Sequence, residues 1–261
     1  MRTAYATPVT QVHQIEVTSR CQLKCSYCPS PLMGKGKPGY RHQLDMSEET
    51  FAATLDWVRW FVKQETQRDL NLAGIGESTM HPRFLEYVER AREVIGPDRK
   101  LIFATNGLLV TEEMARALRP FNPRVWVSVH IQEKAKRAGE ILKRYGLLDG
   151  FSTDPTTNGN SWAGQVDSED SGFRIPCPWI AGGWAFVMAD GNIGSCCLDA
   201  TGITVIGNVK TSRPQTLMNE TSKLCRNCWN RLDYIVDFDQ SRARRSTDDE
   251  NDTDRVHLPV A

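Results

Sequence analysis

The sequence predicts an α/β protein with a parallel sheet, followed by a small cysteine-rich unit at the C-terminal end. From residue 12 to about residue 145, four short apolar segments alternate with four amphipathic helical patterns. Parallel neighbouring strands need crossover connections, and helices supply them in right-handed βαβ units. Beyond about residue 172, the alternation gives way to turn residues and cysteines. The pattern alone leaves open whether the sheet is open and doubly wound or closes toward a barrel.

The first strand is predicted at residues 12–18, directly before a loop with three cysteines. A long Gly-, Pro- and Lys-rich loop follows at 29–44, a length typical of functional or mobile segments. Ser47 then suits the N-cap of a helix, with acidic residues in its first turn. Apolar residues recur after it at helical spacing, which predicts one buried helix face.

Three further strand and helix repeats are predicted in order along the chain. Strands are expected at 70–75, 100–105 and 124–130, and each precedes an amphipathic helix. The last of these helices, 132–145, is basic, and we expect those charges to face solvent. The fifth and sixth strands are expected within 147–175, with 151–153 as the candidate for one of them.

Composition limits the classes of protein that fit. The chain has 261 residues, a formal net charge of zero and eight cysteines. No apolar run has the length of a membrane span, and the first ten residues lack a secretory signal pattern. Cysteines in such a chain favour metal sites in a reducing compartment over disulfides. We therefore expect a cytoplasmic protein without a membrane partner.

The three cysteines of the loop, Cys21, Cys25 and Cys28, have the spacing CxxxCxxC, with Tyr27 before the last. Three thiolates can hold an iron–sulfur cluster but leave one iron without a protein ligand. An open coordination position is where a metal performs chemistry. A zinc knuckle or part of a disulfide framework is the structural alternative.

This motif resembles the signature of the radical S-adenosylmethionine (SAM) enzymes. The resemblance implies a partial (β/α) barrel of five or six parallel strands, and a [4Fe–4S] cluster on Cys21, Cys25 and Cys28. The open iron would bind SAM, with Tyr27 near the adenine. Reductive cleavage of SAM would give a 5′-deoxyadenosyl radical that abstracts a hydrogen atom from a substrate. An external donor of the flavodoxin or ferredoxin type would supply the electron.

Polar groups at the strand ends extend the resemblance. Residues 74–77 resemble a Gly-Gly-Glu element that binds SAM, with isoleucine in second place. Asn106 lies in a Thr-Asn-Gly element, and Ser128 resembles a polar residue that contacts SAM. The expected SAM-binding residues are thus Tyr27, Gly74, Gly76, Glu77, Asn106 and Ser128.

Two residues are candidates for catalysis. His130 shares a strand face with Ser128, where it can contact substrate or move a proton. An interior histidine with a purely structural role is the alternative. Glu16 lies on the first strand near the cysteines, and an inward carboxylate there would be unusual without a role.

A second set of cysteines follows the barrel. Cys177 and Cys196 flank Gly191 in a pattern that resembles the SPASM and twitch auxiliary-cluster domains. A hairpin is predicted from 184–188 and 192–196, and a short helix around 214–223 precedes a CxxC pair. The resemblance implies an auxiliary [4Fe–4S] cluster, while the spacing also permits a four-cysteine zinc site. Cys197 is either a spare thiol or replaces Cys196 as a ligand. The expected ligands are Cys177, Cys196, Cys225 and Cys228.

The expected domains are an N-terminal extension at 1–11, the barrel at 12–172, a twitch-like unit at 173–236 and a polar tail at 237–261. The favoured function is radical SAM oxidation of a small molecule, assisted by the auxiliary cluster. Modification of a nucleotide, nucleobase or peptide is the alternative within the same chemistry. A non-catalytic metal-binding module is the alternative from a different class.

Overall fold

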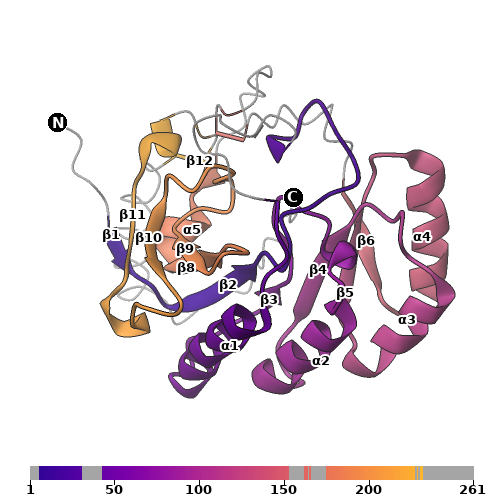
Figure 1. Ribbon diagram of the computed structural model, residues 1–261, viewed down its shortest axis with the longest axis horizontal. Coiled ribbons are helices and arrows are strands. Elements are labelled where there is room, and N and C mark those ends of the chain that lie inside the picture. The colour runs from indigo at the N-terminus through magenta and orange to yellow at the C-terminus, as the bar shows by residue number, and fades with distance from the viewer. Residues whose placement is uncertain are drawn as a thin grey trace, which may run out of the picture.

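The computed structural model describes residues 6–30, 43–152, 162–163, 165, 175–226, 228 and 230–231. Its centre is an eight-stranded sheet with the strand order β10-β9-β8-β2-β3-β4-β5-β6. The strands β2 to β6 are parallel, and the helices α1 to α4 lie along the outer side of this curved sheet (Figure 1). This arrangement is the partial β/α barrel that the sequence predicts.

The barrel strands and helices alternate along the chain. The strands are β2 (Gln11–Ile15), β3 (Leu70–Asn71), β4 (Leu101–Thr105), β5 (Arg124–Ser128) and β6 (Leu148–Ser152). The helices are α1 (Glu48–Lys63), α2 (Phe84–Ile95), α3 (Glu112–Leu118) and α4 (Gln132–Arg144).

Local chemistry sets the helix ends. The hydroxyl of Ser47 accepts a hydrogen bond from the N–H of Thr50 and begins α1, as predicted. Thr111 caps α3 in the same way through the N–H of Met114. Gly96 ends α2 with a φ of 76°, a conformation that favours glycine.

The first two strands are shorter than predicted. β2 ends at Ile15 and β3 at Asn71, since the residues after each turn into the loops of the site. The candidate fifth strand exists as β6, which begins three residues before the predicted 151–153. Among the described residues of 147–175, no other strand joins the central sheet. The sixth parallel strand is instead β8 (Trp184–Val187), which pairs with β2 at the opposite edge.

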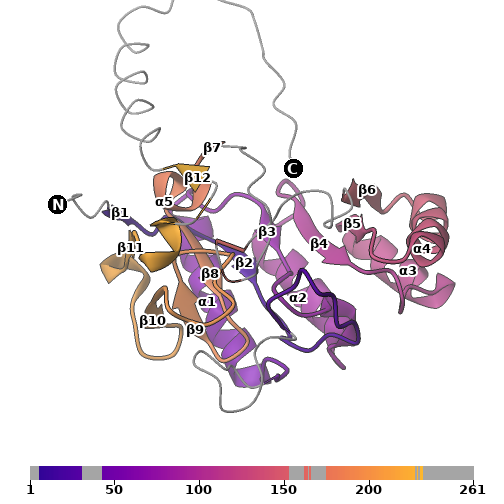
Figure 2. The same ribbon diagram turned by 90° about the horizontal axis from the view of Figure 1, so that it is seen from above.

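The predicted hairpin is confirmed: β8 pairs antiparallel with β9 (Asn192–Gly194) across the turn at Gly191. The hairpin extends the barrel sheet, and β10 (Val205–Asn208) follows β9 (Figure 2). The predicted helix at 214–223 is wrong. This segment forms a 3₁₀ turn at Pro214–Thr216 and the strand β11 (Met218–Glu220), because β11 pairs with β1 (Ala6–Pro8). The short helix of this unit is α5 (Pro178–Gly182), and β7 (Ile175–Pro176) pairs with β12 (Asn230–Arg231).

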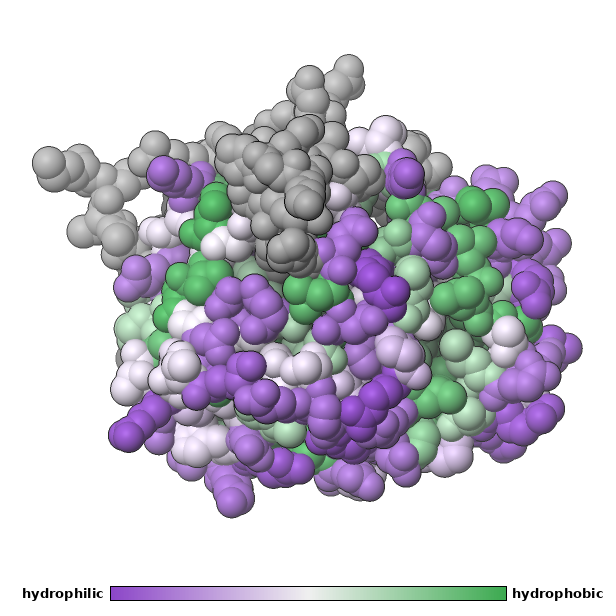
Figure 3. Space-filling view, in the orientation of Figure 1, coloured by the Kyte–Doolittle hydropathy of each residue, from purple (hydrophilic) through white to green (hydrophobic). Residues whose placement is uncertain are grey.

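The core lies between the sheet and its helices, where apolar faces of α1 and α2 meet. The rings of Phe51 and Tyr87 stack at a centroid distance of 3.7 Å. The outward surfaces of these helices are largely hydrophilic (Figure 3). Glu48 bridges Arg83 at 2.5 Å and Arg90 at 2.6 Å there. No described helix is long and apolar enough to cross a membrane.

Candidate active site

A cavity of about 250 Å³ lies where the barrel strands end. Active sites of β/α barrels form at this carboxyl-terminal edge, since the loops after the strands converge there. Every predicted SAM-binding residue lines the cavity, and so do the three cysteines and His130. The remaining lining residues are Leu23, Ser30, Ala73, Ile75, Ala104, Thr105 and Trp162.

The cysteine loop forms one wall of this cavity. The Cys21 sulfur accepts a hydrogen bond from the N–H of Leu23 at 3.4 Å, and the Cys28 sulfur accepts one from Ser30 at 3.5 Å. Burial raises the pKa of Cys21, and it raises that of Cys28 to about 11. Thiols in this state must release their protons to solvent when they bind a metal, so metal binding is coupled to pH.

The segment after β3 is pressed against the start of the cysteine loop. A Cβ at Gly76 would lie 2.2 Å from the carbonyl oxygen of Thr18, so only glycine fits there. The N–H of Glu77 donates to the carbonyl oxygen of Arg20 at 2.8 Å. The predicted SAM-binding backbone is therefore fixed relative to the cysteines.

The Glu77 side chain joins the segment after β3 to the end of β4 through hydrogen bonds. Its carboxylate accepts hydrogen bonds from the Thr105 hydroxyl at 2.8 Å and the Asn106 N–H at 2.7 Å. The Asn106 amide in turn reaches the Cys21 sulfur at 3.9 Å and accepts a bond from Gln22 at 3.3 Å. Asn106 thus faces both the cavity and the cysteine loop.

Ser128 and His130 both line the cavity, as their shared strand face predicts. The Nδ1 atom of His130 lies 2.6 Å from the Tyr27 hydroxyl, and the two rings are nearly parallel at 5.8 Å. This contact joins the cysteine loop to the end of β5. It places a titratable ring and a phenol side by side at the cavity.

Glu16 is buried as predicted, but it is absent from the cavity lining within the described residues. Its carboxylate accepts hydrogen bonds from the N–H groups of Ile75 at 3.1 Å and Ala189 at 3.2 Å. These bonds join the loop after β3 to the turn after β8. A Cβ at Gly74 would lie 2.4 Å from Glu16 Cγ, so the Glu16 side chain leaves room only for glycine at this position. The contacts give Glu16 a positioning role.

Sequence reasoning missed Trp162, which lies within the expected barrel segment 12–172 but in none of its predicted motifs. Trp162 lines the cavity and packs with Ile75 and Ala200. The Gln165 side chain donates to the carbonyl oxygens of Trp162 and Leu198, both at 2.6 Å, and accepts from the Ala200 N–H at 3.3 Å. No spacing or periodicity marks this contact, because it joins residues more than thirty positions apart in the chain.

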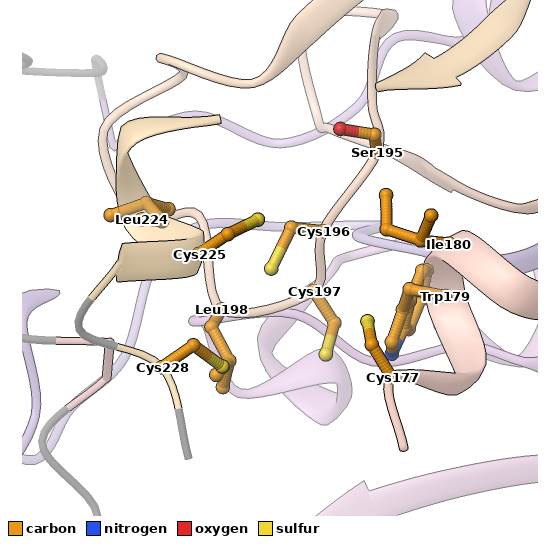
Figure 4. Close-up of a pocket in the computed structure, with 10 residues that line it drawn as sticks. All are labelled: Cys177, Trp179, Ile180, Ser195, Cys196, Cys197, Leu198, Leu224, Cys225 and Cys228. Atoms are coloured by element: carbon orange, nitrogen blue, oxygen red, sulfur yellow. The ribbon is translucent and has the colours of Figure 1, made fainter. Parts of the chain in front are cut away.

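A second pocket gathers the remaining cysteines next to α5 and the turn after β9. The sulfurs of Cys177, Cys196, Cys197, Cys225 and Cys228 face one region (Figure 4). Trp179, Ile180 and Leu224 give it apolar walls. The free space between the side chains is about 20 Å³, little more than one water needs. Burial raises the pKa of Cys177 to about 11 and that of Cys197 to about 12.

The donor chemistry of both sites fits iron–sulfur clusters. Soft thiolates converge, and N–H groups point at several sulfurs. Among the described residues, no group of three or more His, Cys, Asp or Glu could hold a single metal ion. This finding is compatible with a cluster, because each thiolate of a four-iron cluster binds a different iron and the ligands stand farther apart.

The sequence matches the family model of the Radical SAM superfamily over residues 15–151, more than half of the chain. The chain belongs to this superfamily, whose members use a [4Fe–4S] cluster and SAM and need an external electron donor.

Two solved structures share the fold. BtrN in complex with AdoMet and 2-DOIA has a TM-score of 0.63 at 18% identity, covering 91% of this chain and 89% of BtrN. The anSMEcpe structure with bound AdoMet has a TM-score of 0.52 at 16% identity, covering 77% of this chain and 78% of that one.

A curated relative matches only in part. The tungsten-containing aldehyde ferredoxin oxidoreductase cofactor-modifying protein of Pyrococcus furiosus is 35% identical over 104 residues. The match covers 40% of this chain and 26% of the relative. The chain therefore spans about a quarter of that protein's length.

Proposed function

We propose that this chain cleaves SAM reductively and uses the 5′-deoxyadenosyl radical to oxidise a small molecule, with an auxiliary [4Fe–4S] cluster as the electron acceptor. One observation carries the proposal: a second, five-cysteine pocket is joined to the SAM cavity through Leu198, Ala200 and Trp162. The proposed radical generator and the proposed electron acceptor are thus linked by direct residue contacts within a single chain.

The first site has three groups of residues with separate roles. Cys21, Cys25 and Cys28 would hold the SAM-binding cluster, and the backbone of 74–77 with Asn106 and Ser128 would hold SAM beside it. Tyr27 and His130 close the wall near the end of β5. When bound, this cluster supplies the electron that cleaves SAM.

The oxidation balances as follows for an alcohol substrate. The radical takes the hydrogen atom from the carbinol carbon and becomes 5′-deoxyadenosine. The remaining carbon radical gives up one proton and one electron and becomes a ketone. His130 is the candidate to receive the proton, because its ring lines the cavity and imidazole is a common proton acceptor in catalysis. The auxiliary cluster, held by Cys177, Cys196, Cys225 and Cys228, is the acceptor for the electron.

The relatives favour a small molecule over a peptide. The BtrN structure holds AdoMet and 2-DOIA and resembles this chain over 91% of its length. One anSMEcpe structure holds AdoMet with a peptide, and it covers 79% of this chain at a TM-score of 0.52. We further propose a cytoplasmic setting, since seven of the eight cysteines are proposed cluster ligands and cysteines used in this way are typical of a reducing compartment.

The test combines iron counting with isotope transfer. Anaerobic reconstitution should load about eight irons per chain, and Cys225→Ala with Cys228→Ala should leave about four. Small alcohols, aminocyclitols among them, are then deuterated at the carbinol carbon and incubated with the reconstituted chain, SAM and a reductant. Deuterium in 5′-deoxyadenosine together with a ketone product supports the proposal. About four irons in the unaltered protein would contradict the auxiliary cluster. If 5′-deoxyadenosine acquires deuterium only from a peptide or a nucleoside, the proposed small-molecule substrate class is wrong.

A further inference from the structure

The second pocket contains one thiol more than a four-iron cluster needs. Five cysteines line it, and two of them, Cys196 and Cys197, are neighbours in the chain. In an extended strand, neighbouring side chains point to opposite faces. Here both sulfurs are turned toward the same region (Figure 4). The backbone must therefore change direction at this pair.

The turn that follows β9 provides this change of direction. Residues 197–198 form a turn, and Asp199 directly after them is fully buried. The Asp199 carboxylate accepts backbone hydrogen bonds from Thr201 at 2.9 Å, Gly202 at 2.7 Å and Thr204 at 2.7 Å. A carboxylate with three N–H donors fixes the loop, so both cysteines are held at the pocket by the fold.

The spacing along the chain distinguishes the two neighbours. Cys196 has the distance from Gly191 that the predicted ligand pattern requires, and Cys197 lies one residue beyond it. Both residues line the pocket, so the geometry allows either sulfur to serve as a ligand.

We propose that Cys196 and Cys197 are interchangeable ligands for one iron of the auxiliary cluster, with Cys196 the ordinary ligand and Cys197 in reserve. The proposal rests on the auxiliary cluster proposed above. Whichever of the two thiols binds the iron releases its proton to solvent, and the other stays protonated. No further redox partner is needed, because one thiolate replaces another.

The test uses the full chain after anaerobic reconstitution, with iron and acid-labile sulfide as readouts. The variants are Cys196→Ala, Cys197→Ala and the double replacement, with Cys225→Ala as the reference for a ligand that has no neighbour to replace it.

We expect each single variant of the pair to retain about eight irons, and the double variant to fall to about four. Loss of the auxiliary irons in Cys196→Ala, to the level of Cys225→Ala, would overturn the proposal. So would their loss in Cys197→Ala. About four irons in the unaltered chain would instead show that the auxiliary cluster itself is absent.

Discussion

The Glu77 carboxylate accepts a hydrogen bond of 2.7 Å from the backbone N–H of Asn106. This bond joins the loop after β3 to the loop after β4, and both residues line the same cavity. The Thr105 hydroxyl donates to the other carboxylate oxygen at 2.8 Å. The side chain of Glu77 thus sets the distance between two parts of the predicted SAM site, while its backbone faces the cysteine loop.

Glu77→Gln should destabilise the fold and weaken SAM binding. The amide keeps one acceptor oxygen and places an NH₂ group against donors, which costs about 1–3 kcal/mol for a buried group. Denaturant unfolding and anaerobic equilibrium dialysis with SAM measure the two effects. Glu86→Gln is the matched control, because Glu86 pairs with Arg83 at the surface. Equal changes in unfolding free energy and in SAM affinity for the two variants would contradict the role of Glu77.

Glu16→Gln distinguishes a positioning role from a catalytic one. The glutamine retains one of the two backbone contacts, so we expect a loss of about 1–3 kcal/mol in the free energy of unfolding. SAM cleavage by the folded, reconstituted fraction should remain within a few-fold of the unaltered enzyme. A loss of about a hundredfold or more in cleavage, with stability unchanged, would restore Glu16 as a catalytic residue.

The contact between Tyr27 and His130 should appear as coupling in SAM binding. The single variants Tyr27→Phe and His130→Phe and the double variant form a cycle. Their hydrogen bond of 2.6 Å predicts a coupling of about 0.5–1.5 kcal/mol if it orders the cavity wall. Strictly additive changes in the dissociation constant of SAM would show that the contact does not act on this site.

His13 should make stability depend on pH outside the active site. Its ring stacks on Trp184 at a centroid distance of 4.0 Å, and burial lowers its pKa from 6.5 to about 4. As the pH falls from 6.5 to 4, the unfolded state takes up the proton first, so stability is lost across this range. The loss amounts to about 3 kcal/mol. In His13→Phe, the free energy of unfolding should depend less on pH between 6.5 and 4. An unchanged pH dependence would contradict the role of His13.

Much of the fold could be predicted from sequence because its signals are local. The caps at Ser47 and Thr111, the helical spacing of apolar residues and the hairpin turn at Gly191 depend on neighbours in the chain. The residues expected to bind SAM from the family resemblance line one cavity, because they follow parallel strands whose ends converge. The lengths of β2 and β3 could not be predicted from the sequence, because packing of the site loops ends these strands early.

The missed features depend on contacts between distant segments. The pairing of β8 with β2 joins residues about 170 positions apart, and neither strand signals its partner. The positioning role of Glu16 likewise depends on Ile75 and Ala189, which lie in two other loops. Trp162 lies at the cavity, where it packs with Ile75 and Ala200 and is joined through Gln165 to the loop at Leu198. Periodicity cannot reveal such contacts, since it reports only which face of an element is buried.

The release of 5′-deoxyadenosine tests the central claim most directly. The reconstituted chain is incubated anaerobically with SAM and a strong reductant, and the nucleoside is quantified. We expect several equivalents per chain, and none above background when Cys21, Cys25 and Cys28 are replaced by alanine. Cys225→Ala with Cys228→Ala should still release it, because the second pocket is separate from the SAM cavity. A fully loaded protein that releases no 5′-deoxyadenosine would contradict the account.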